Sequence, residues 1–432
     1  MALRRLDLRG FAGDRRELTA RLPRPVDEQD RSSEAVAAII AEVRAGGDDA
    51  LRACTARYDH VDLDELRVPA AELRAALTRI PPSLQEALDV AHDRILAYHA
   101  HEAGDEPGDF TSGGITVRHL VRPVDRAGCY APGGRARYPS TVLMCAVPAH
   151  VAGVEEIVLC VPPGPDGRVD DATLAAAAVA GVTEVYRVGG AQAVAAMAYG
   201  TESIAAVDVI VGPGNRYVAE AKRQVSGVVG VASAFAGPSE VVVVAGPDTP
   251  PEYAAIDLVV QAEHGPDGLA WLVTWSEEIA DAVDAAVDRI VAESPRRADL
   301  EATLGAGGWA VLVDGPKQAA AVSNVVAPEH LELLTKHADA ILGNIRSAGA
   351  VFLGTNAPAS IGDYLAGPNH VLPTNRTARF ASALRVDDFR KHIHAVRVED
   401  EAVRALGPHV VTLAETEGLP AHARSVELRW PG

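Results

Sequence analysis

The feature that most constrains the fold of this chain is a regular alternation of short apolar runs and helical segments. Between residues 155 and 227, each of three such runs is followed by a segment of helical composition: EEIVLCVPPG, EVYRVGG and VDVIVGPG. A strand, a helix and a second parallel strand form a right-handed crossover unit. The rhythm therefore predicts a parallel sheet covered by helices.

The same rhythm restarts near residue 239 and continues to about residue 354. The later apolar runs are SEVVVVAG, LAWLVTWS, WAVLVDG, LELLT and AVFLG, and helical segments separate them. A chain of 432 residues is also too long for one small core. We therefore expect an α/β protein with two parallel sheets in tandem.

The two ends of the chain depart from this pattern. About the first 107 residues read as helical, with long helices expected in SSEAVAAIIAEVRAGGDDALRACTARYD and PPSLQEALDVAHDRILAYHAHEAGD. From about residue 381 the alternation weakens into a small tail. This tail contains one strand-like run, HAVRV, and a final helix within EGLPAHARSVELR.

Charge and apolar content exclude two classes of partner. The net charge is −19 and the pI is near 5.2, whereas nucleic acids and anionic membranes select a basic surface. No stretch approaches the roughly 20 apolar residues of a membrane span. The first residues, MALRRLDLRG, do not have the continuous apolar core of a signal peptide. We therefore expect a cytoplasmic protein that binds neither nucleic acid nor membrane; the net charge says little about a small substrate, which responds only to the local field.

The four cysteines support the same compartment. None of them forms a C-x-x-C pair, and so few thiols in a long chain without a secretion signal indicate a reducing environment. We expect most of them to be small buried hydrophobes. Cys129 is singled out because it lies beside a glycine-rich turn.

Three glycine-rich turns follow expected strands, which is where α/β sheets bind ligands. They cover residues 129–140, 188–196 and 211–222, and the third, VGPGNRYVAEAK, resembles a phosphate-binding turn. Gly212 and Gly214 would let backbone amides approach an anion at a helix N-terminus. Tyr217 replaces the third glycine of the dinucleotide fingerprint, so a plain tight turn is the alternative interpretation.

Polar side chains form a second group of candidates. In QAEHGPDG, Gln261 and His264 are three residues apart and would share a helix face. The further candidates occur as pairs: Glu329 with His330, Asp363 with His370, and Glu417 with His422. Taken one at a time, each could be a surface, cap or core residue. Taken together, they include ligand types that suit Zn²⁺ or Mn²⁺ and an adjacent Glu-His pair that could carry protons.

Many of these stretches match one family. The chain resembles the histidinol dehydrogenases in YAPGGRARYPSTVLM, RVGGAQA, VGPGNRYVAEAKR, AGPSE, QAEHGPD, APEHLEL, GAVFLG, GDYLAGPNHVLPT and EGLPAHA, in the family's order and over nearly the whole length. This resemblance implies oxidation of L-histidinol to L-histidine through histidinal, with two NAD⁺ used in succession and a Zn²⁺ ion that holds the substrate.

The resemblance also implies a role for each matching residue. The implied metal ligands are Gln261, His264, Asp363 and His422. The implied catalytic pair is Glu329, which would activate water, and His330, which would take the alcohol proton. The implied substrate contacts are Ser239, His370 and Glu417, in addition to the metal ligands and the catalytic pair. The implied NAD contacts are Tyr130, Gln192 and Asn215.

The family's fold is two incomplete Rossmann-like domains with parallel sheets, a helical N-terminal segment and a small C-terminal tail. The resemblance places an N-terminal arm at residues 1–25, a catalytic domain at 26–129 and 237–380, an NAD-binding domain at 130–236 and a dimerisation tail at 381–432. It implies a homodimer in which His422 and Glu417 of one chain complete the active site of the other.

Two departures from the family pattern bear on the substrate. The residues before AGPSE are GVASAF, without the Asp that the family usually has there, and LRVDDFRKHIHAVRV is more basic than usual. Two alternatives therefore accompany histidinol oxidation. One is oxidation of another small polar, amino or sulfonated alcohol, and the other is a zinc-stabilised binding protein without turnover.

Overall fold

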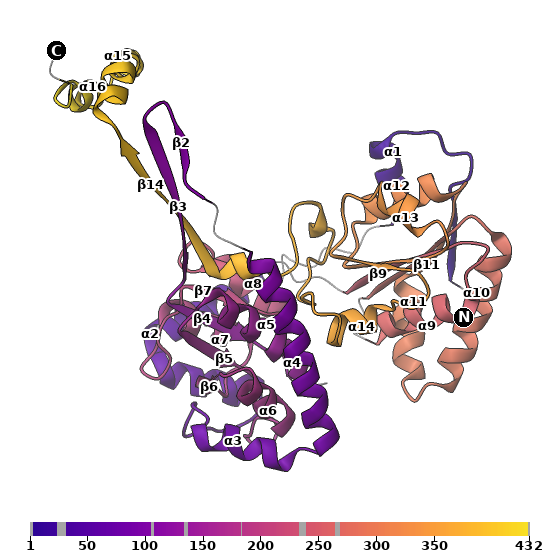
Figure 1. Cartoon of the computed structure of the whole chain (residues 1–432). Helices are drawn as coiled ribbons and strands as arrows, with labels where there is room; N and C mark the ends of the chain where they lie inside the picture. Colours follow the sequence, from indigo (N-terminus) through magenta and orange to yellow (C-terminus); the bar gives the residue numbers. More distant parts are fainter. Residues whose placement is uncertain are drawn as a thin grey trace. The chain divides into compact units, whose positions relative to one another are not determined.

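The computed structural model describes residues 3–23, 32–104, 108–133, 137–182, 184–232, 239–263 and 268–430 (Figure 1). The chain forms two compact units. The first contains residues 1–102 and 125–389, and the second contains residues 103–124 and 390–432. Each unit is described by itself.

A six-stranded parallel sheet lies in the first unit, with the order β1-β11-β10-β9-β12-β13. Its strands are β1 (Arg4–Asp7), β11 (Gly308–Leu312), β10 (Leu269–Thr274), β9 (Glu240–Ala245), β12 (His330–Leu334) and β13 (Ala350–Leu353).

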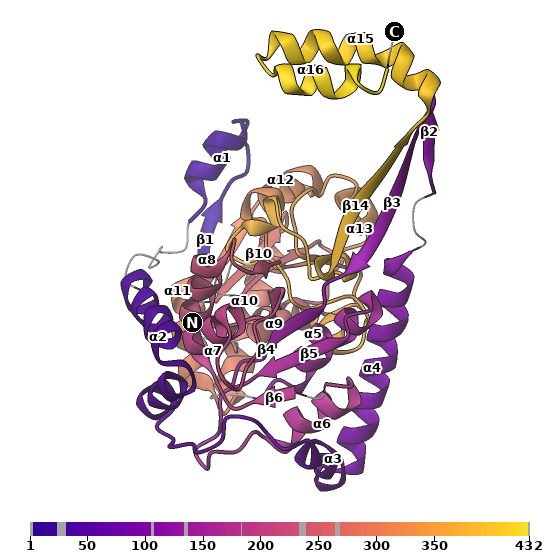
Figure 2. The same ribbon diagram turned by 90° about the vertical axis from the view of Figure 1, so that its left-hand side faces the viewer.

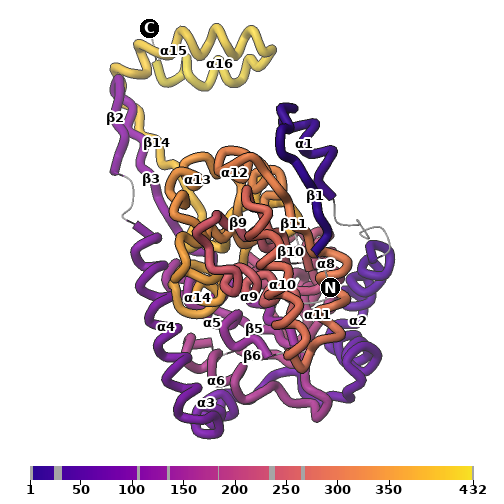
Figure 3. The backbone as a smooth tube through the Cα atoms, turned by 90° about the vertical axis from the view of Figure 1, so that its right-hand side faces the viewer, coloured from indigo at the N-terminus to yellow at the C-terminus, as the bar shows by residue number. Residues whose placement is uncertain are grey.

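Helices cover both faces of this sheet, as Figures 1 and 3 show. Val241 and Val243 of β9 pack against the first group, which is α9 (Pro251–Ala262), α10 (Glu277–Glu293) and α11 (Arg297–Gly307). Val242 and Val244 belong to the opposite core, with α1 (Arg15–Arg21), α12 (Pro316–Val326) and α13 (Ala338–Leu342). Burial on both faces explains why the sequence of β9 is an unbroken apolar run.

A five-stranded parallel sheet, also in the first unit, has the order β6-β5-β4-β7-β8. Its strands are β4 (Arg126–Tyr130), β5 (Glu156–Cys160), β6 (Glu184–Tyr186), β7 (Val209–Val211) and β8 (Gly230–Val231). The helices that follow them in the chain are α5 (Pro139–Ala152), α6 (Asp171–Val179), α7 (Gly190–Tyr199) and α8 (Arg216–Val225).

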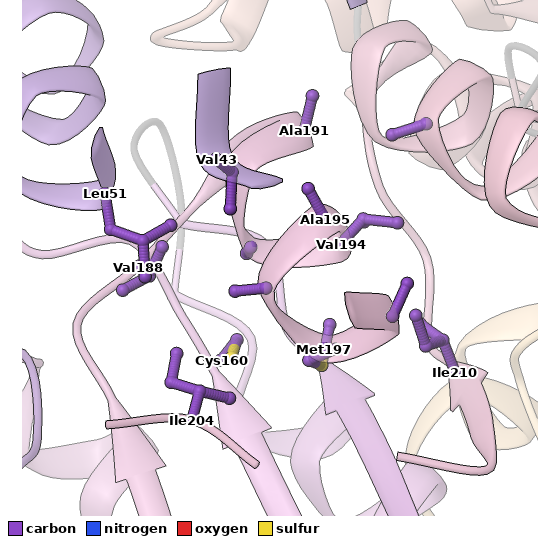
Figure 4. Packing of buried hydrophobic residues seen from close by; sticks show 14 of the residues in the cluster. Val43, Leu51, Cys160, Val188, Ala191, Val194, Ala195, Met197, Ile204 and Ile210 are labelled. Atoms are coloured by element: carbon purple, nitrogen blue, oxygen red, sulfur yellow. The ribbon is translucent and has the colours of Figure 1, made fainter. Parts of the chain in front are cut away.

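The core beside the five-stranded sheet is built largely from small side chains of α7 (Figure 4). Ala191, Val194 and Ala195 lie beside Val43 of the N-terminal helix α2 (Ser33–Tyr58) in the same cluster. The small side chains of α7 allow α2 and α7 to approach closely. The core is therefore closely packed, although the chain contains few aromatic residues.

The N-terminal segment is helical, as predicted, after the short strand β1. Helix α2 contacts α7 and α8, and α3 (Ala70–Arg79) contacts α6. These helices therefore pack on those of the five-stranded sheet, whereas the predicted boundaries group residues 26–129 with the other sheet. The division into domains remains a proposal.

The two sheets share one strand order. In each, the first strand of the crossover series is central, the second and third lie on one side of it, and the fourth and fifth lie on the other. The switch point therefore falls between β4 and β7 in one sheet and between β9 and β12 in the other. This order is the one that places ligands beside the switch point in Rossmann-like folds.

The second unit is an antiparallel ribbon with two helices (Figure 2). Its three-stranded sheet has the order β14-β3-β2, with strands β14 (Arg390–Val398), β3 (Ile115–Pro123) and β2 (Phe110–Ser112). Helices α15 (Asp400–Thr416) and α16 (Pro420–Glu427) follow the ribbon and contact each other. The predicted tail strand and final helix are present, but α15, β2 and β3 were not anticipated.

The fold class predicted from the sequence is confirmed: α/β, with two parallel sheets, a helical N-terminal segment and a small C-terminal tail. Within the described parts of the chain, no helix combines the length and apolar character that a bilayer crossing requires. All four cysteines are free and buried, Cys129 included. Burial raises the pKa of Cys145 and Cys160 to about 12 and that of Cys129 well above its usual value, so these thiols are packing groups.

Candidate active site

The Glu-His pair lies where strand β12 begins. Leu331 and Leu333 face the core beside α12, so the alternation of a strand directs His330 and Glu332 to the opposite face, toward α9. Glu329 is 8% exposed and His330 is 6% exposed. Two titratable side chains buried at a strand end, with no apolar packing role, are candidates for proton transfer.

Two carboxylates flank the imidazole of His330. Its Nε2 lies 3.4 Å from Oδ1 of Asp363, which belongs to α14 (Ala359–Tyr364), and its Nδ1 lies 3.9 Å from Oε2 of Glu329. Burial lowers the pKa of His330, but the negative charges of Glu329 and Asp363 outweigh burial and raise that pKa above its usual value. The structure thus brings together three of the residues predicted from the sequence.

Glu329 is held by the beginning of the neighbouring strand. Its Oε2 accepts a hydrogen bond from the backbone N–H of Glu240, the first residue of β9, at 3.2 Å. Ser239 precedes Glu240, and its carbonyl accepts a hydrogen bond from the backbone N–H of Leu269 at 3.1 Å. Ser239 and Glu329 therefore both lie at the amino ends of adjacent parallel strands.

Glu240 is a buried carboxyl group that the sequence analysis did not identify. It is 1% exposed, and burial together with the charge of Glu329 raises its pKa to about 8, against an opposing effect of Arg376. The signal in the sequence was weak, because AGPSE presents Glu240 only as the polar start of an apolar strand. The charge of Glu329 therefore favours the protonated form of Glu240.

Gln261 lies in the last turn of α9 and is 4% exposed. Its amide Nε2 is buried and has no hydrogen-bond partner among the described residues. A buried amide is normally hydrogen-bonded, so the unsatisfied amide identifies Gln261 as a candidate ligand-binding residue. His264, the other predicted ligand from this stretch, lies outside the described residues.

His370 is tied to both Asp363 and helix α5. Its Nδ1 lies 2.7 Å from the backbone oxygen of Asp363 and its Nε2 lies 3.3 Å from Oγ1 of Thr141. A carbonyl can only accept, so Nδ1 carries a proton and donates it to the backbone oxygen of Asp363. The two contacts fix the orientation of the His370 ring beside Asp363.

Glu417 and His422 belong to the second unit. Glu417 caps the end of α15 and His422 lies in α16, and both side chains are exposed.

The first-unit residues fit a divalent cation in charge and donor type. Asp257 of α9 and Glu332 of β12 are buried, and neither forms an ion pair with a lysine or arginine within the described ranges. Amide, imidazole and carboxylate donors suit Zn²⁺. The described residues alone contain no group of three His, Cys, Asp or Glu side chains arranged for a metal, and the predicted set indeed takes its other donors from Gln261, His264 and His422.

The predicted cofactor residues lie at the carboxyl ends of the strands of the five-stranded sheet. Tyr130 ends β4, and its hydroxyl oxygen accepts a hydrogen bond from the backbone N–H of Gly190 at 3.0 Å. Gln192 is 2% exposed in the first turn of α7. Asn215 is the N-cap of α8, and its Oδ1 accepts hydrogen bonds from the backbone N–H groups of Tyr217 and Val218 at 3.0 and 3.1 Å.

The turn that carries Asn215 packs directly on β4. Gly212 has φ +103° and touches the backbone of Tyr130, so a side chain at this position would have no room. Tyr130, Gly190 and Gly212 therefore bring the turns after β4, β6 and β7 together at the switch point. The glycine pattern, although not the usual fingerprint, does mark this convergence of three turns.

Lys222 is a second residue that the sequence analysis missed. It lies on α8, is 3% exposed, and its Nζ donates a hydrogen bond to the carbonyl of Gly212. Burial lowers its pKa to about 8. In the sequence it resembles an ordinary exposed lysine of an amphipathic helix. Only its burial in the folded protein distinguishes Lys222 from a surface lysine.

Comparisons with known proteins agree on one family. A family model described as histidinol dehydrogenase matches residues 22–430. Histidinol dehydrogenase of Neisseria gonorrhoeae is 47% identical over 397 residues, covering 91% of this chain and 92% of that protein. Histidinol dehydrogenase of Gluconobacter oxydans is 46% identical over 432 residues and covers 99% of both. A crystal structure of histidinol dehydrogenase from Elizabethkingia anophelis aligns with a TM-score of 0.93 at 34% identity, covering 99% of this chain and 98% of that one.

Proposed function

We propose that this chain, which belongs to the histidinol dehydrogenase family, oxidises L-histidinol to L-histidine in two successive NAD-linked steps. The observation that carries the proposal is the buried Glu329–His330 pair, with Asp363 against His330 Nε2. An alcohol oxidation needs a base, and the following aldehyde oxidation needs an activated water. This site offers one group suited to each.

His330 serves as the base of the first step. Its imidazole takes the proton of the alcohol while the carbon-bound hydrogen leaves as hydride to NAD⁺. The contact with Asp363 orients the ring, and the neighbouring carboxylates stabilise the imidazolium that forms. A positioned base of this kind typically contributes about 10²–10⁴-fold in rate.

Glu329 serves the second step. Its carboxylate takes a proton from the water that attacks the aldehyde, and the backbone N–H of Glu240 holds that carboxylate in place. The hydrated aldehyde then loses a second hydride to NAD⁺ and becomes the carboxylate of histidine. His330, adjacent to the same carbon, can take the remaining hydroxyl proton.

The residues that would hold Zn²⁺ are Gln261, His264, Asp363 and His422. When bound, the ion supplies Lewis-acid polarisation and a fixed point for the substrate's nitrogen atoms, without redox chemistry. The orphaned amide of Gln261 and the excess of buried carboxyl groups support this assignment. Ser239, His370 and Glu417 would contact the substrate.

The residues that would hold NAD are Tyr130, Gln192 and Asn215. Their position at the carboxyl ends of β4, β6 and β7, beside the N-terminus of α8, supports this assignment, because helix N-termini attract the pyrophosphate of a dinucleotide. In the proposed domain assignment, residues 130–236 form the cofactor-binding part, which contains strands β5 to β8 of the five-stranded sheet.

The active protein would be a homodimer. His422 and Glu417 are exposed in the second unit, which also displays large apolar side chains, among them Val396 and Leu413 at 61% and 65% exposure. Exposed apolar surface of this kind marks an interface. The tail would complete the partner's site, and an ultracentrifugation experiment that finds only monomers at assay concentrations would contradict this assembly. The four buried, unpaired cysteines support a reducing, cytoplasmic location.

The direct test is NADH formation by the purified protein with Zn²⁺ and L-histidinol, against a panel of other amino, polar and sulfonated alcohols. We expect L-histidinol to give the highest kcat/KM and two NADH per substrate. A preference for another alcohol would identify a sister activity. A protein that binds Zn²⁺ but oxidises none of the panel would have to be a binding protein.

A further inference from the structure

An open hollow in the first unit is lined mainly by arginine side chains, and no step of the proposed reaction uses it. Its walls come from the start of α1 and from the 3₁₀ turn η2 (Thr377–Arg379) with the residue before that turn. We call it the arginine hollow, and its lining residues are Asp14, Arg15, Arg16, Thr19, Arg376 and Arg379. In a chain whose net charge is −19, a local excess of positive charge indicates a surface that attracts anions.

Three of the guanidinium groups have no carboxylate beside them. Within the described ranges, no ion pair is formed by Arg15, Arg16 or Arg379. By contrast, Arg57 and Arg289, which are exposed elsewhere on the first unit, pair with glutamates at 3.0 and 2.9 Å. The charges of the arginine hollow are therefore not explained by neighbouring acidic side chains.

The one carboxylate of the hollow, Asp14, is held by the backbone of its own helix. Its Oδ1 accepts hydrogen bonds from the backbone N–H groups of Arg16 and Glu17 at 2.8 and 2.9 Å, as the N-cap of α1. These bonds occupy the amide donors at the start of the helix. An anion in the hollow would consequently bind to the guanidinium groups and not to the end of α1.

The second wall of the hollow has a strained backbone. Asn375 and Arg376 are consecutive residues with φ of +52° and +61°. Asparagine adopts this region more readily than most residues, but arginine does so rarely, whereas glycine would adopt it without strain. Strain of this kind is frequent at binding sites, where the side chain rather than the backbone determines which residue is present. The Nε of Arg379 also donates a hydrogen bond to the carbonyl of Arg376 at 3.0 Å, which holds the two arginines close together.

We propose that the arginine hollow binds an anion with several phosphate charges, such as pyrophosphate or the triphosphate of a nucleotide. Four guanidinium groups and one carboxylate leave three positive charges in the hollow, which suits a multiply charged ligand better than a single carboxylate. Guanidinium groups bind phosphate oxygens through paired N–H donors. The proposal is independent of the proposed function, because it involves none of the proposed catalytic, metal or NAD residues.

Substitutions can change the charge of the hollow in both directions. Arg15→Gln and Arg379→Gln each remove one positive charge from an exposed side chain. Asp14→Ser removes the one negative charge and keeps an oxygen that can cap α1. Arg289→Gln is the matched control, because it removes one positive charge from α10, on the opposite face of the six-stranded sheet from α1.

The test is calorimetric titration of the full-length protein with inorganic phosphate, pyrophosphate and ATP at about 50 mM salt, where screening is weak. Saturating NAD⁺ is present throughout, so that the proposed cofactor site is filled. We expect saturable binding of about one pyrophosphate or ATP per chain and weaker binding of phosphate. Equal affinity for pyrophosphate and ATP would show that phosphate groups alone are recognised, and tighter binding of ATP would identify a nucleotide as the ligand.

The variants should change the affinity for pyrophosphate in a set order. We expect Arg15→Gln and Arg379→Gln to weaken binding by about three- to tenfold, because each removes a charged donor from a partly solvated site. Asp14→Ser should strengthen binding by about threefold, and Arg289→Gln should stay within about 1.5-fold of the parent. Thermal midpoints show which variants are folded, and a gain of affinity in Asp14→Ser cannot result from misfolding.

Three results would overturn the proposal. One is the absence of saturable binding of both pyrophosphate and ATP. Another is equal weakening in Arg289→Gln and Arg379→Gln, because the effect would then come from the net charge of the protein. The third is parental affinity in Asp14→Ser, Arg15→Gln and Arg379→Gln, which would place the bound anion elsewhere. Histidinol oxidation is measured separately, so none of these results contradicts the proposed function.

Discussion

The two parallel sheets of this protein have the same strand order but place their functional groups at opposite strand ends. In the five-stranded sheet, Tyr130 and Asn215 follow the carboxyl ends of β4 and β7. In the six-stranded sheet, Ser239 and the Glu329–His330 pair precede or begin β9 and β12. In both sheets the residues lie on the strands beside the switch point. The strand order therefore determines which strands carry the functional groups, but not whether the groups lie at the amino or the carboxyl ends of those strands.

The electrostatics of the crossover helices account for the difference. Helices begin beyond the carboxyl ends of parallel strands, so that side of a sheet faces helix N-termini, which attract anions such as a pyrophosphate. Helices end beside the amino ends of the strands, and their C-termini favour cations. Gln261 lies at the C-terminus of α9, on the side where buried carboxyl groups also gather. The proposed site of the anionic pyrophosphate is thus at the end of the five-stranded sheet that faces helix N-termini, and the proposed site of Zn²⁺ is at the end of the six-stranded sheet that faces helix C-termini.

The largest expected effect is a loss of turnover at the six-stranded sheet that leaves NAD⁺ binding at the five-stranded sheet unchanged. Glu329→Gln removes the base for water activation, so we expect overall turnover to fall by about 10²–10⁴-fold. The NAD⁺ dissociation constant, measured by fluorescence titration, should stay within about twofold. A variant that loses NAD⁺ affinity along with turnover would break the division between the two sheets.

The next effect tests the carboxyl ends of the five-stranded sheet. Asn215→Leu removes an N-cap and a proposed NAD contact, whereas Asn215→Ser keeps a capping oxygen. We expect the KM for NAD⁺ to rise about tenfold or more in both, equivalent to about 1.4 kcal/mol. Only the leucine variant should also lose about 1 kcal/mol of stability.

Histidinol provides the control for Asn215. Its KM should change little in either variant, because the substrate is proposed to bind at the other sheet. Equal increases in both KM values would place this turn outside the cofactor site.

A smaller effect is expected from Lys222. Its amine holds the carbonyl of Gly212 in the same turn, and Lys222→Met keeps the length of the side chain without this hydrogen bond. We expect the KM for NAD⁺ to rise by about fivefold, or about 1 kcal/mol, with kcat nearly unchanged. A fall in kcat without a change in KM would show that the buried amine acts elsewhere.

The smallest effect concerns the stability of the amino-end cluster. Because the pKa of Glu240 is raised to about 8, this group contributes stability at low pH that is lost as pH rises toward 8. Glu240→Gln mimics the protonated form and should gain stability over the parent between pH 5 and pH 8.5, by at most about 4 kcal/mol. A thermal-midpoint difference that stays constant with pH would show that Glu240 does not titrate in this range.

The sequence predicts the strands that are buried on both faces, because only such strands form unbroken apolar runs. It does not reveal the exposed ribbon strands β2 and β3. The Glu329–His330 pair stands out as two adjacent polar residues before an apolar run. Asp257 and Glu332 do not stand out, because polar residues within a helix and a strand look solvent-exposed until the fold buries them.

The strand end that each group occupies is also absent from the sequence. Glycine-rich turns after apolar runs do indicate the carboxyl ends, and the cofactor residues that the family resemblance implies fall in such turns. No comparable sequence signal marks the amino ends of strands, because a polar residue before an apolar run can equally be the last residue of the preceding loop. The contact between His330 and Asp363 depends on the path of α14, which no local pattern specifies.

The central claim, that the two sheets bind ligands of opposite charge at opposite strand ends, is tested most directly by one diffraction measurement. Crystals of the protein with Zn²⁺ and NAD⁺ would be measured at the zinc absorption edge. We predict an anomalous peak about 2.0–2.2 Å from donor atoms of Gln261 and Asp363, at the amino ends of β9 and β12, with the dinucleotide at the carboxyl ends of β4 and β7. A zinc peak at the carboxyl ends of either sheet, away from Gln261 and Asp363, would contradict the account.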